Sequence, residues 1–127
     1  MKADGIIIKK VKYVPEDAIN LIEKVLRHNG VTIYARINQQ EEARVNGVRI
    51  LPIIFLMFGN PSKGAKVMLE NPIAAIDLPL KVIAWQDEQR ENYIAFNDAK
   101  YLTKRYGLSR ASAVIIDLEE MLSKILK

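Results

Sequence analysis

The residues best suited to chemistry lie in the segment 59–64, which reads GNPSKG. The backbone N–H groups of Ser62 and Lys63, the Ser62 hydroxyl and the Lys63 ammonium could together hold a phosphate or a carboxylate. The alternative is plain helix capping, because Asn is a strong N-cap and Pro is favoured at the first helical position. A P-loop is not supported, since Lys63 precedes Gly64 and that motif places its lysine after the second glycine. The segment predicts a small-anion site at Asn60, Ser62 and Lys63, with capping as the competing explanation.

Three further polar residues, Asp77, Lys81 and Asn97, are candidates for the same site. The Asp77 carboxylate could accept a hydrogen bond from a ligand, and the Lys81 ammonium could neutralise an anion. Each also has a structural explanation, because Asp in a turn caps backbone N–H groups and Asn97 could cap a helix. Strand ends in a sheet of this kind often share one rim, so we expect Asn60, Asp77 and Asn97 to converge there.

Several other chemistries are excluded by what the sequence lacks. It has no cysteine, which excludes disulfides, Cys-ligated zinc and thiol catalysis. Its one histidine, His28, cannot form a multi-histidine metal site within one chain. Ser109 and Ser112 have no GxSxG context, so we reject a serine hydrolase. We therefore assign no catalytic residue, no metal and no cofactor.

The charge of the chain is mildly basic, with a formal net charge of +4 at pH 7. Nucleic-acid binding usually needs a denser basic stripe with stacking aromatics, so we expect no nucleic-acid partner. The longest apolar run is too short to cross a bilayer, so we expect no membrane partner and a cytoplasmic location. Trp85 lies among apolar residues and is expected in the core or at a dimer interface.

The element that must position the first site is the unbroken apolar run at residues 52–58. Its uniform hydrophobicity predicts a buried strand, which ends at Gly59. A helix from Pro61 to about Leu69 follows at once. This junction would point free backbone N–H groups and the positive end of a helix dipole past a buried strand.

Hydrophobic periodicity and cap residues predict the remaining elements. Further strands are expected at residues 5–14, 31–37, 80–86 and 92–96, and residues 76–79 are expected to be extended or turning. Further helices are expected at residues 15–29 and 39–46, from the cap at 97–98 to about 106, and from the cap at 109 onward. The order β-α-β-α-β-α-β-β-α-α predicts an α+β fold in a single domain over residues 1–127. Helices pack on a mixed sheet of four or five strands in this prediction.

The chain resembles a known family, the bacterial and archaeal domain of unknown function numbered 302. The resemblance rests on the motifs FGNP at residues 58–61, IDLPLKV at 76–82 and FND at 96–98, and it covers essentially the whole chain. It implies a small α+β domain that forms a homodimer and has no established biochemical activity. Asn38 stands where members often carry a histidine, which argues against a metal or acid–base role there. Ala99 replaces the proline that follows the family's Asn-Asp pair.

Three functions remain open at this point. The first is a non-enzymatic cytosolic domain that binds a small anionic ligand at the rim near Asn60. The second is a structural or interaction homodimer without a ligand, joined through an exposed apolar surface. The third, which we rank last, is an enzyme that uses Asp77, Lys81 and Asn97 on the rim.

Overall fold

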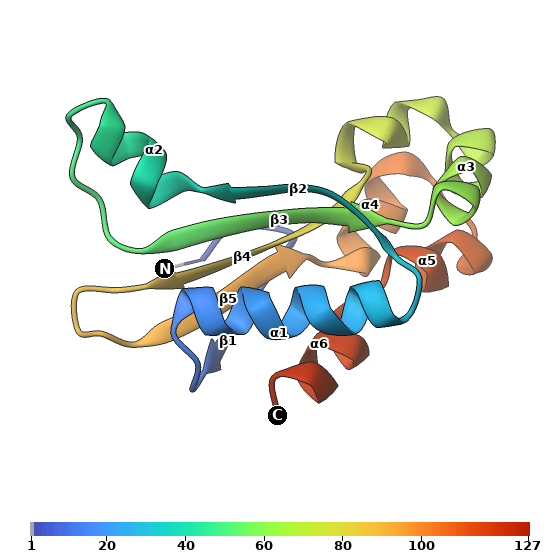
Figure 1. Ribbon diagram of the computed structural model, residues 1–127. Helices are drawn as coiled ribbons and strands as arrows, with labels where there is room; N and C mark the ends of the chain where they lie inside the picture. Colours follow the sequence, from blue (N-terminus) through green and yellow to red (C-terminus); the bar gives the residue numbers. More distant parts are fainter. Residues whose placement is uncertain (1) are drawn as a thin grey trace.

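Five strands form one sheet in the order β1-β5-β4-β3-β2 (Figure 1). The strands are β1 (Ile6–Val11), β2 (Thr32–Asn38), β3 (Ile53–Gly59), β4 (Leu80–Gln86) and β5 (Asn92–Asn97). The structure is a computed structural model and describes residues 2–127. The α+β class predicted from the sequence is confirmed.

The sheet is antiparallel throughout, whereas the sequence predicted a mixed sheet. The mixed sheet was predicted because a helix that connects two strands in the sequence suggested that those strands are parallel neighbours in the sheet. However, β1 and β2, which flank the first helix, lie at opposite edges with three strands between them. The strands that are neighbours in space therefore all run in opposite directions.

The helices are α1 (Pro15–His28), α2 (Gln39–Val45), α3 (Pro61–Glu70), α4 (Ala99–Tyr106), α5 (Arg110–Ile116) and α6 (Glu119–Ile125). A 3-10 helix, η1 (Pro72–Asp77), occupies part of the stretch that was expected to be extended or turning. The predicted last helix is two helices, because Asp117 has extended backbone angles (φ −83°, ψ 119°). The Asp117 side chain then accepts a hydrogen bond from the N–H of Glu119 (3.0 Å) and so starts α6.

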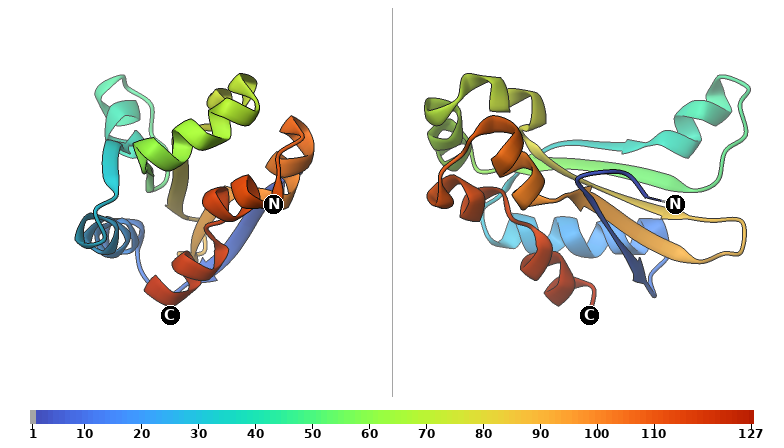
Figure 2. Two further views of the ribbon diagram at one scale, coloured as in Figure 1. Left: turned by 90° about the vertical axis from the view of Figure 1, so that its right-hand side faces the viewer. Right: turned by 180° about the vertical axis from the view of Figure 1, so that it is seen from behind.

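Helices α1 and α6 cover one face of the sheet and form the main core with it (Figures 1 and 2). Residues of α1 such as Ile19 and Ile22 are fully buried against Leu56 of β3 and Val82 of β4. A second, smaller core joins α3, η1, α4 and α5 beyond one end of the sheet, and Figure 2 (left) views this end. This cluster builds the surroundings of the β3–α3 junction.

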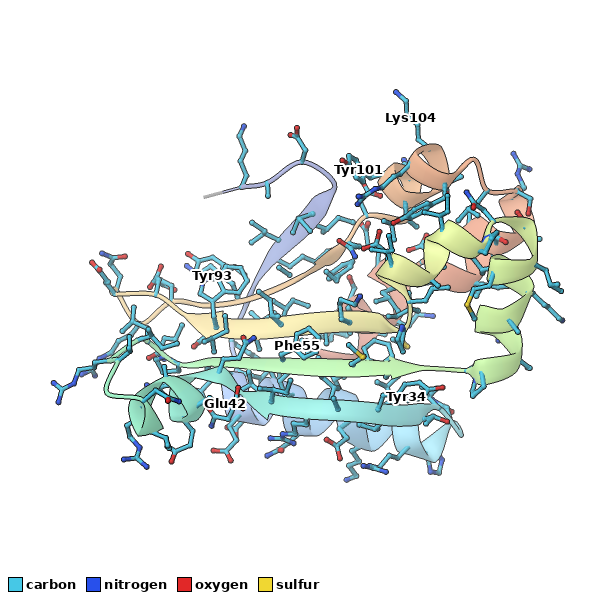
Figure 3. The ribbon with its side chains drawn as sticks, turned by 90° about the horizontal axis from the view of Figure 1, so that it is seen from above. Tyr34, Glu42, Phe55, Tyr93, Tyr101 and Lys104 are labelled. Atoms are coloured by element: carbon cyan, nitrogen blue, oxygen red, sulfur yellow. The ribbon has the colours of Figure 1, made fainter. Side chains whose placement is uncertain are left out.

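The opposite face of the sheet carries alternate strand residues, which point away from α1 because side chains alternate along a strand. We call this surface the open face and define it by Ile37, Phe55, Met57, Ile83, Trp85 and Tyr93. Figure 3 looks onto it, and the strands are visible along their central parts without an overlying helix. The rings of Trp85 and Tyr93 stack there with centroids 5.3 Å apart.

Candidate functional site

The junction between β3 and α3 is built as the sequence predicted, with Asn60 as the N-cap of α3 and Pro61 at its first position. The Asn60 side-chain oxygen accepts hydrogen bonds from the N–H groups of Ser62 (3.0 Å) and Lys63 (3.2 Å). It also accepts one from the Ser62 hydroxyl (2.9 Å). The capping alternative is therefore confirmed. Since the cap already satisfies these two N–H groups, a ligand here would depend on the Lys63 ammonium more than on the backbone.

A cavity of about 160 Å³ lies directly beside this junction. Its walls come from the start of β2, the β3–α3 junction, the segment after η1 and the end of α5. The lining residues are Tyr34, Gly59, Asn60, Pro61, Lys63, Gly64, Met68, Leu78, Pro79, Leu80, Ile115 and Ile116. The wall is largely apolar, and Lys63 is its one charged residue among those that the structure describes. The rim expected from the sequence thus has room for a small molecule.

Tyr34 reaches this cavity through an irregularity in β2. The pairing of β2 with β3 shifts between Ile33 and Ala35, so Tyr34 lies in a β-bulge. Bulges redirect a side chain and are common beside functional sites. Figure 3 shows Tyr34 near the start of β2, on the side of the sheet where β3 leads into α3. A carbon added at Gly59 would lie 3.7 Å from the Tyr34 ring, which places the ring over the strand end.

The α3 and α5 walls of the cavity are tied together by Glu70. Its carboxylate accepts hydrogen bonds from the Ser109 N–H (2.8 Å), the Ser109 hydroxyl (2.7 Å) and the Ser112 hydroxyl (2.6 Å). These bonds, with that from Ser112 the strongest, hold the pKa of Glu70 below its ordinary value. Ser112 is buried, so this clamp fixes α5 against the C-terminal end of α3.

We expect Glu70→Gln to reduce the loss of stability in acid. A carboxyl whose pKa is lowered by folding stabilises the protein above its unfolded pKa, about 4.3 for Glu, and this stabilisation is lost as pH falls through the folded pKa. The wild type should therefore lose more stability than the variant as the pH is lowered from neutral. Urea unfolding at a series of pH values measures this difference. Glu88→Gln in the β4–β5 turn is the matched control, and identical pH curves for Glu70→Gln and wild type would contradict the clamp.

Asp77 faces α4 rather than the cavity. Its Oδ2 accepts hydrogen bonds from the Tyr106 hydroxyl and from Nη1 of Arg105 (3.4 Å). The hydrogen bond to Asp77 raises the pKa of Tyr106, and burial adds to the effect. Asp77 therefore joins η1 to α4, and its contacts are structural.

Lys81 and Asn97 lie on the open face of the sheet. Lys81 pairs in register with Met57, and Asn97 pairs with Ile6 at the end of β5. The cap of α4 is Asp98, whose side chain accepts from the N–H of Lys100 (2.9 Å), so Asn97 does not provide it.

The predicted convergence on one rim holds for the strand ends but not for the side chains. Strands β3 and β5 both end, and β4 begins, at the same edge, because β4 runs antiparallel between them. Of the six predicted site residues, however, only Asn60 and Lys63 line the cavity. Ser62 hydrogen-bonds to Asn60. The apolar walls of the cavity were not predicted from the sequence. Gly64, a glycine inside a predicted helix, was a local sign that one wall lacks a side chain.

The sequence matches the family model of the domain of unknown function DUF302 over residues 7–127. The chain belongs to the DUF302 family. A solved relative, the uncharacterized conserved protein DUF302 from Bacillus stearothermophilus, has the same fold with a TM-score of 0.79. The two chains are 21% identical, and the match covers 98% of this chain and 97% of the other.

The DUF302 chain also matches curated proteins of Brucella. Fluoride-specific ion channel FluC 1 of Brucella suis biovar 1 is 24% identical over 112 residues, which is 88% of this chain and 44% of that protein. Fluoride-specific ion channel FluC 2 of Brucella melitensis biotype 1 is 24% identical over 112 residues, 88% of this chain and 42% of that protein. This chain thus spans less than half the length of the curated relatives it matches.

Two further features bear on what the DUF302 chain can do. Across residues 2–127, no helix has the length and apolar character needed to cross a membrane. Within the same residues, no cluster of three or more His, Cys, Asp or Glu side chains is placed to hold a metal ion.

Proposed function

We propose that this DUF302 domain binds a small amphipathic anion, such as an aromatic or short-chain carboxylate, in the cavity beside Asn60 and Lys63. The observation that carries the proposal is an apolar cavity of about 160 Å³ whose lining includes a single charged residue, Lys63. An apolar protein cavity of about 150 Å³ can hold benzene. A ligand with a body of that size and one anionic group would suit this site.

The charge at the site favours an anion. Lys63 lies in the first turn of α3, where the helix dipole already attracts negative charge. Within residues 2–127, Lys63 forms no ion pair. The Brucella relatives are named for fluoride, also a small anion, which agrees with a ligand of this charge.

The size of the cavity depends on Gly64. Apart from its chain neighbours and the backbone of its own helix, no atom lies within 4 Å of the position that a side-chain carbon at Gly64 would occupy. A glycine inside a helix is less favourable than alanine by about 1 kcal/mol. The glycine at position 64 therefore lowers the stability of α3, and the helical backbone there does not need a glycine. Bare backbone at Gly64 leaves the cavity wall open for a ligand.

Thermal unfolding with and without candidate ligands tests the proposal. We expect benzoate and hexanoate to raise the melting temperature, and benzyl alcohol, which has a similar body without the charge, to raise it less. A ligand at a hundred times its Kd stabilises the folded state by about 2.7 kcal/mol. Phosphate and fluoride test whether an inorganic anion alone is sufficient.

Two variants locate the effect. Gly64→Leu fills the cavity without a clash at Cβ and should abolish the response to benzoate, while Lys63→Met should weaken it. Lys104→Met on α4 is the matched control and should respond as the wild type does. No response to any carboxylate, or a full response in Gly64→Leu, would overturn the proposal.

A second candidate function is assembly without a ligand, and the apolar open face favours it. We do not propose an enzyme based on Asp77, Lys81 and Asn97, because these side chains do not share a cavity.

A further inference from the structure

Another hollow lies at the opposite end of the sheet from the cavity beside Lys63. It has a volume of about 520 Å³ and lies between the segment that leads into β3 and the turn that joins β4 to β5. Figure 1 shows these two segments at the left of the sheet, away from α3. We call this hollow the turn groove. Its lining residues are Ile50, Leu51, Pro52, Ile53, Trp85, Gln86, Asp87, Glu88 and Gln89.

Backbone hydrogen bonds hold both sides of the turn groove in place. The N–H of Gln86 donates to the carbonyl of Pro52 (3.0 Å), which extends the pairing of β3 with β4 beyond the strand. In the turn, the N–H of Asp87 donates to the carbonyl of Glu91 (2.9 Å), and the N–H of Arg90 donates to the carbonyl of Asp87 (3.0 Å). Sites for small molecules are usually largely preformed hollows of about 300–1,000 Å³. The turn groove has a volume in this range, and its backbone walls are already paired.

The indole of Trp85 forms one wall of the turn groove. Trp85 lies outside both buried cores and is partly exposed. In the sheet register it lies between Ile53 of β3 and Tyr93 of β5. Its ring stacks on that of Tyr93, with centroids 5.3 Å apart, and Tyr93 does not line the groove. The groove therefore borders the indole on the side toward Ile53. Trp is the aromatic side chain that attracts a cation most strongly, because the face of its ring is negative.

Both charged residues in the lining of the turn groove are acidic, although the chain as a whole has a net charge of +4. Oδ1 of Asp87 accepts hydrogen bonds from the N–H groups of Gln89 (3.0 Å) and Glu91 (2.8 Å), which fix this carboxylate in place. Among residues 2–127, Oδ2 of Asp87 and the Glu88 carboxylate take part in no hydrogen bond or ion pair. Their charge is available to a ligand.

The basic side chains near this turn do not line the turn groove. Lys10 forms an ion pair with Glu91 (2.9 Å), and the hydrogen bond to Glu91 is the main cause of the raised pKa of Lys10, with a smaller contribution from the charge of Asp87. Arg49 lines a different hollow, which lies beside α2. Arg90 belongs to the turn but not to the lining of the groove. The lining therefore remains acidic.

We propose that the turn groove binds a small organic ammonium ion, with its charge against Trp85 and Glu88 and its apolar part against Leu51. Aromatic rings are the usual partners of quaternary ammonium groups in proteins. Leu51 is 47% exposed, so a ligand that covers it removes apolar surface from water. A metal ion would gain nothing from an apolar wall and prefers several oxygen ligands. The proposal does not depend on the anion cavity, because the groove lies at the start of β3 and the cavity at its end.

Fluorescence titration tests the proposal, since Trp85 is the single tryptophan of the chain. The probes are choline and tetraethylammonium, added at constant ionic strength. The control ligand is the neutral analogue of choline in which a carbon atom replaces the nitrogen. We expect a saturable change in Trp85 emission with both ammonium ions, and binding of the neutral analogue about tenfold weaker because it lacks the attraction to the indole and the carboxylates. No change with either ion, or equal binding of choline and its analogue, would overturn the proposal.

Variants that remove one negative charge locate the cation. Glu88→Gln should weaken choline binding about two- to fivefold, the usual effect of one exposed ion pair. Asp87→Asn should act similarly, and it keeps the oxygen that accepts from the N–H groups of Gln89 and Glu91. Glu120→Gln on α6 is the matched control, because α6 covers the other face of the sheet. Unchanged choline binding in the double variant Asp87→Asn/Glu88→Gln, or an equal loss in Glu120→Gln, would place the cation elsewhere and overturn the proposal.

Trp85→Leu tests the indole itself, with thermal unfolding as the measurement. Choline should raise the melting temperature of the wild type, because a ligand that binds the folded state stabilises it, and should raise that of the variant much less. Lys63→Met should respond to choline as the wild type does, since Lys63 lies beyond the other end of β3. A full response to choline in Trp85→Leu would contradict the proposal. If Trp85→Leu does not fold, the exposed turn variant Glu88→Gln still decides.

Discussion

Replacing Phe58 by alanine is expected to lower the free energy of unfolding by about 3–5 kcal/mol. Phe58 is 2% exposed and belongs to the main core. It lies between Ile33 of β2 and Leu80 of β4 in the sheet register. Its removal loses the transfer free energy of the ring and leaves a void that the surrounding strands cannot fill. Typical domains have only about 5–15 kcal/mol of stability, so this change removes a large share.

Equilibrium unfolding in urea measures the effect of Phe58→Ala. Phe58→Leu keeps most of the volume and should cost about 1.5 kcal/mol or less. Because Phe58 precedes Gly59 and Asn60, the alanine variant should also weaken any response to benzoate. A loss below about 1 kcal/mol would contradict the burial of Phe58 in the core.

Replacing Asp77 by alanine is expected to cost about 2–3 kcal/mol, the second-largest effect. Hydrogen bonds to a charged group contribute about 1.5–3 kcal/mol, and a buried donor that loses its acceptor has its own desolvation cost. Tyr106 is 8% exposed, so water cannot easily replace the Asp77 carboxylate as a partner for its hydroxyl. The variant should separate η1 from α4 locally while the sheet remains folded.

A double-mutant cycle isolates the Asp77–Tyr106 interaction. Tyr106→Phe alone should cost less than Asp77→Ala, because Asp77 keeps Arg105 as a partner and is 18% exposed. The double variant should cost less than the sum of the two single changes, by about 1 kcal/mol. Strict additivity would show that the two side chains do not interact.

Much of the fold could be predicted because its signals are local. Asn38 and Asn60 are side-chain caps whose positions mark the starts of α2 and α3. Runs of apolar or alternating residues likewise located every strand of the sheet. The pairing of β1 with β5 could not be predicted, because these two strands are separated by most of the chain. The break at Asp117 was missed because the apolar residues on its two sides continue one helical spacing.

Only part of the candidate site could be predicted from the sequence. Asn60 and Lys63 belong to one short segment, so cap preferences identified them together. Tyr34 and Ile115 reach the same cavity from distant parts of the chain, and no local pattern links them to it. Asp77 was assigned to the site because carboxylates suggest ligands, yet the partner that engages it lies on α4.

The edge position of β1 has a consequence for how the chain is made. Among the described strands, β1 pairs only with β5, from Ile6 opposite Asn97 to Val11 opposite Asn92. During synthesis the first strand therefore emerges from the ribosome long before its neighbour exists. Strands β2, β3 and β4 can pair in sequence as they appear, whereas β1 must wait until residue 97 is available. The beginning of the chain is in this sense among the last parts of the sheet to be assembled.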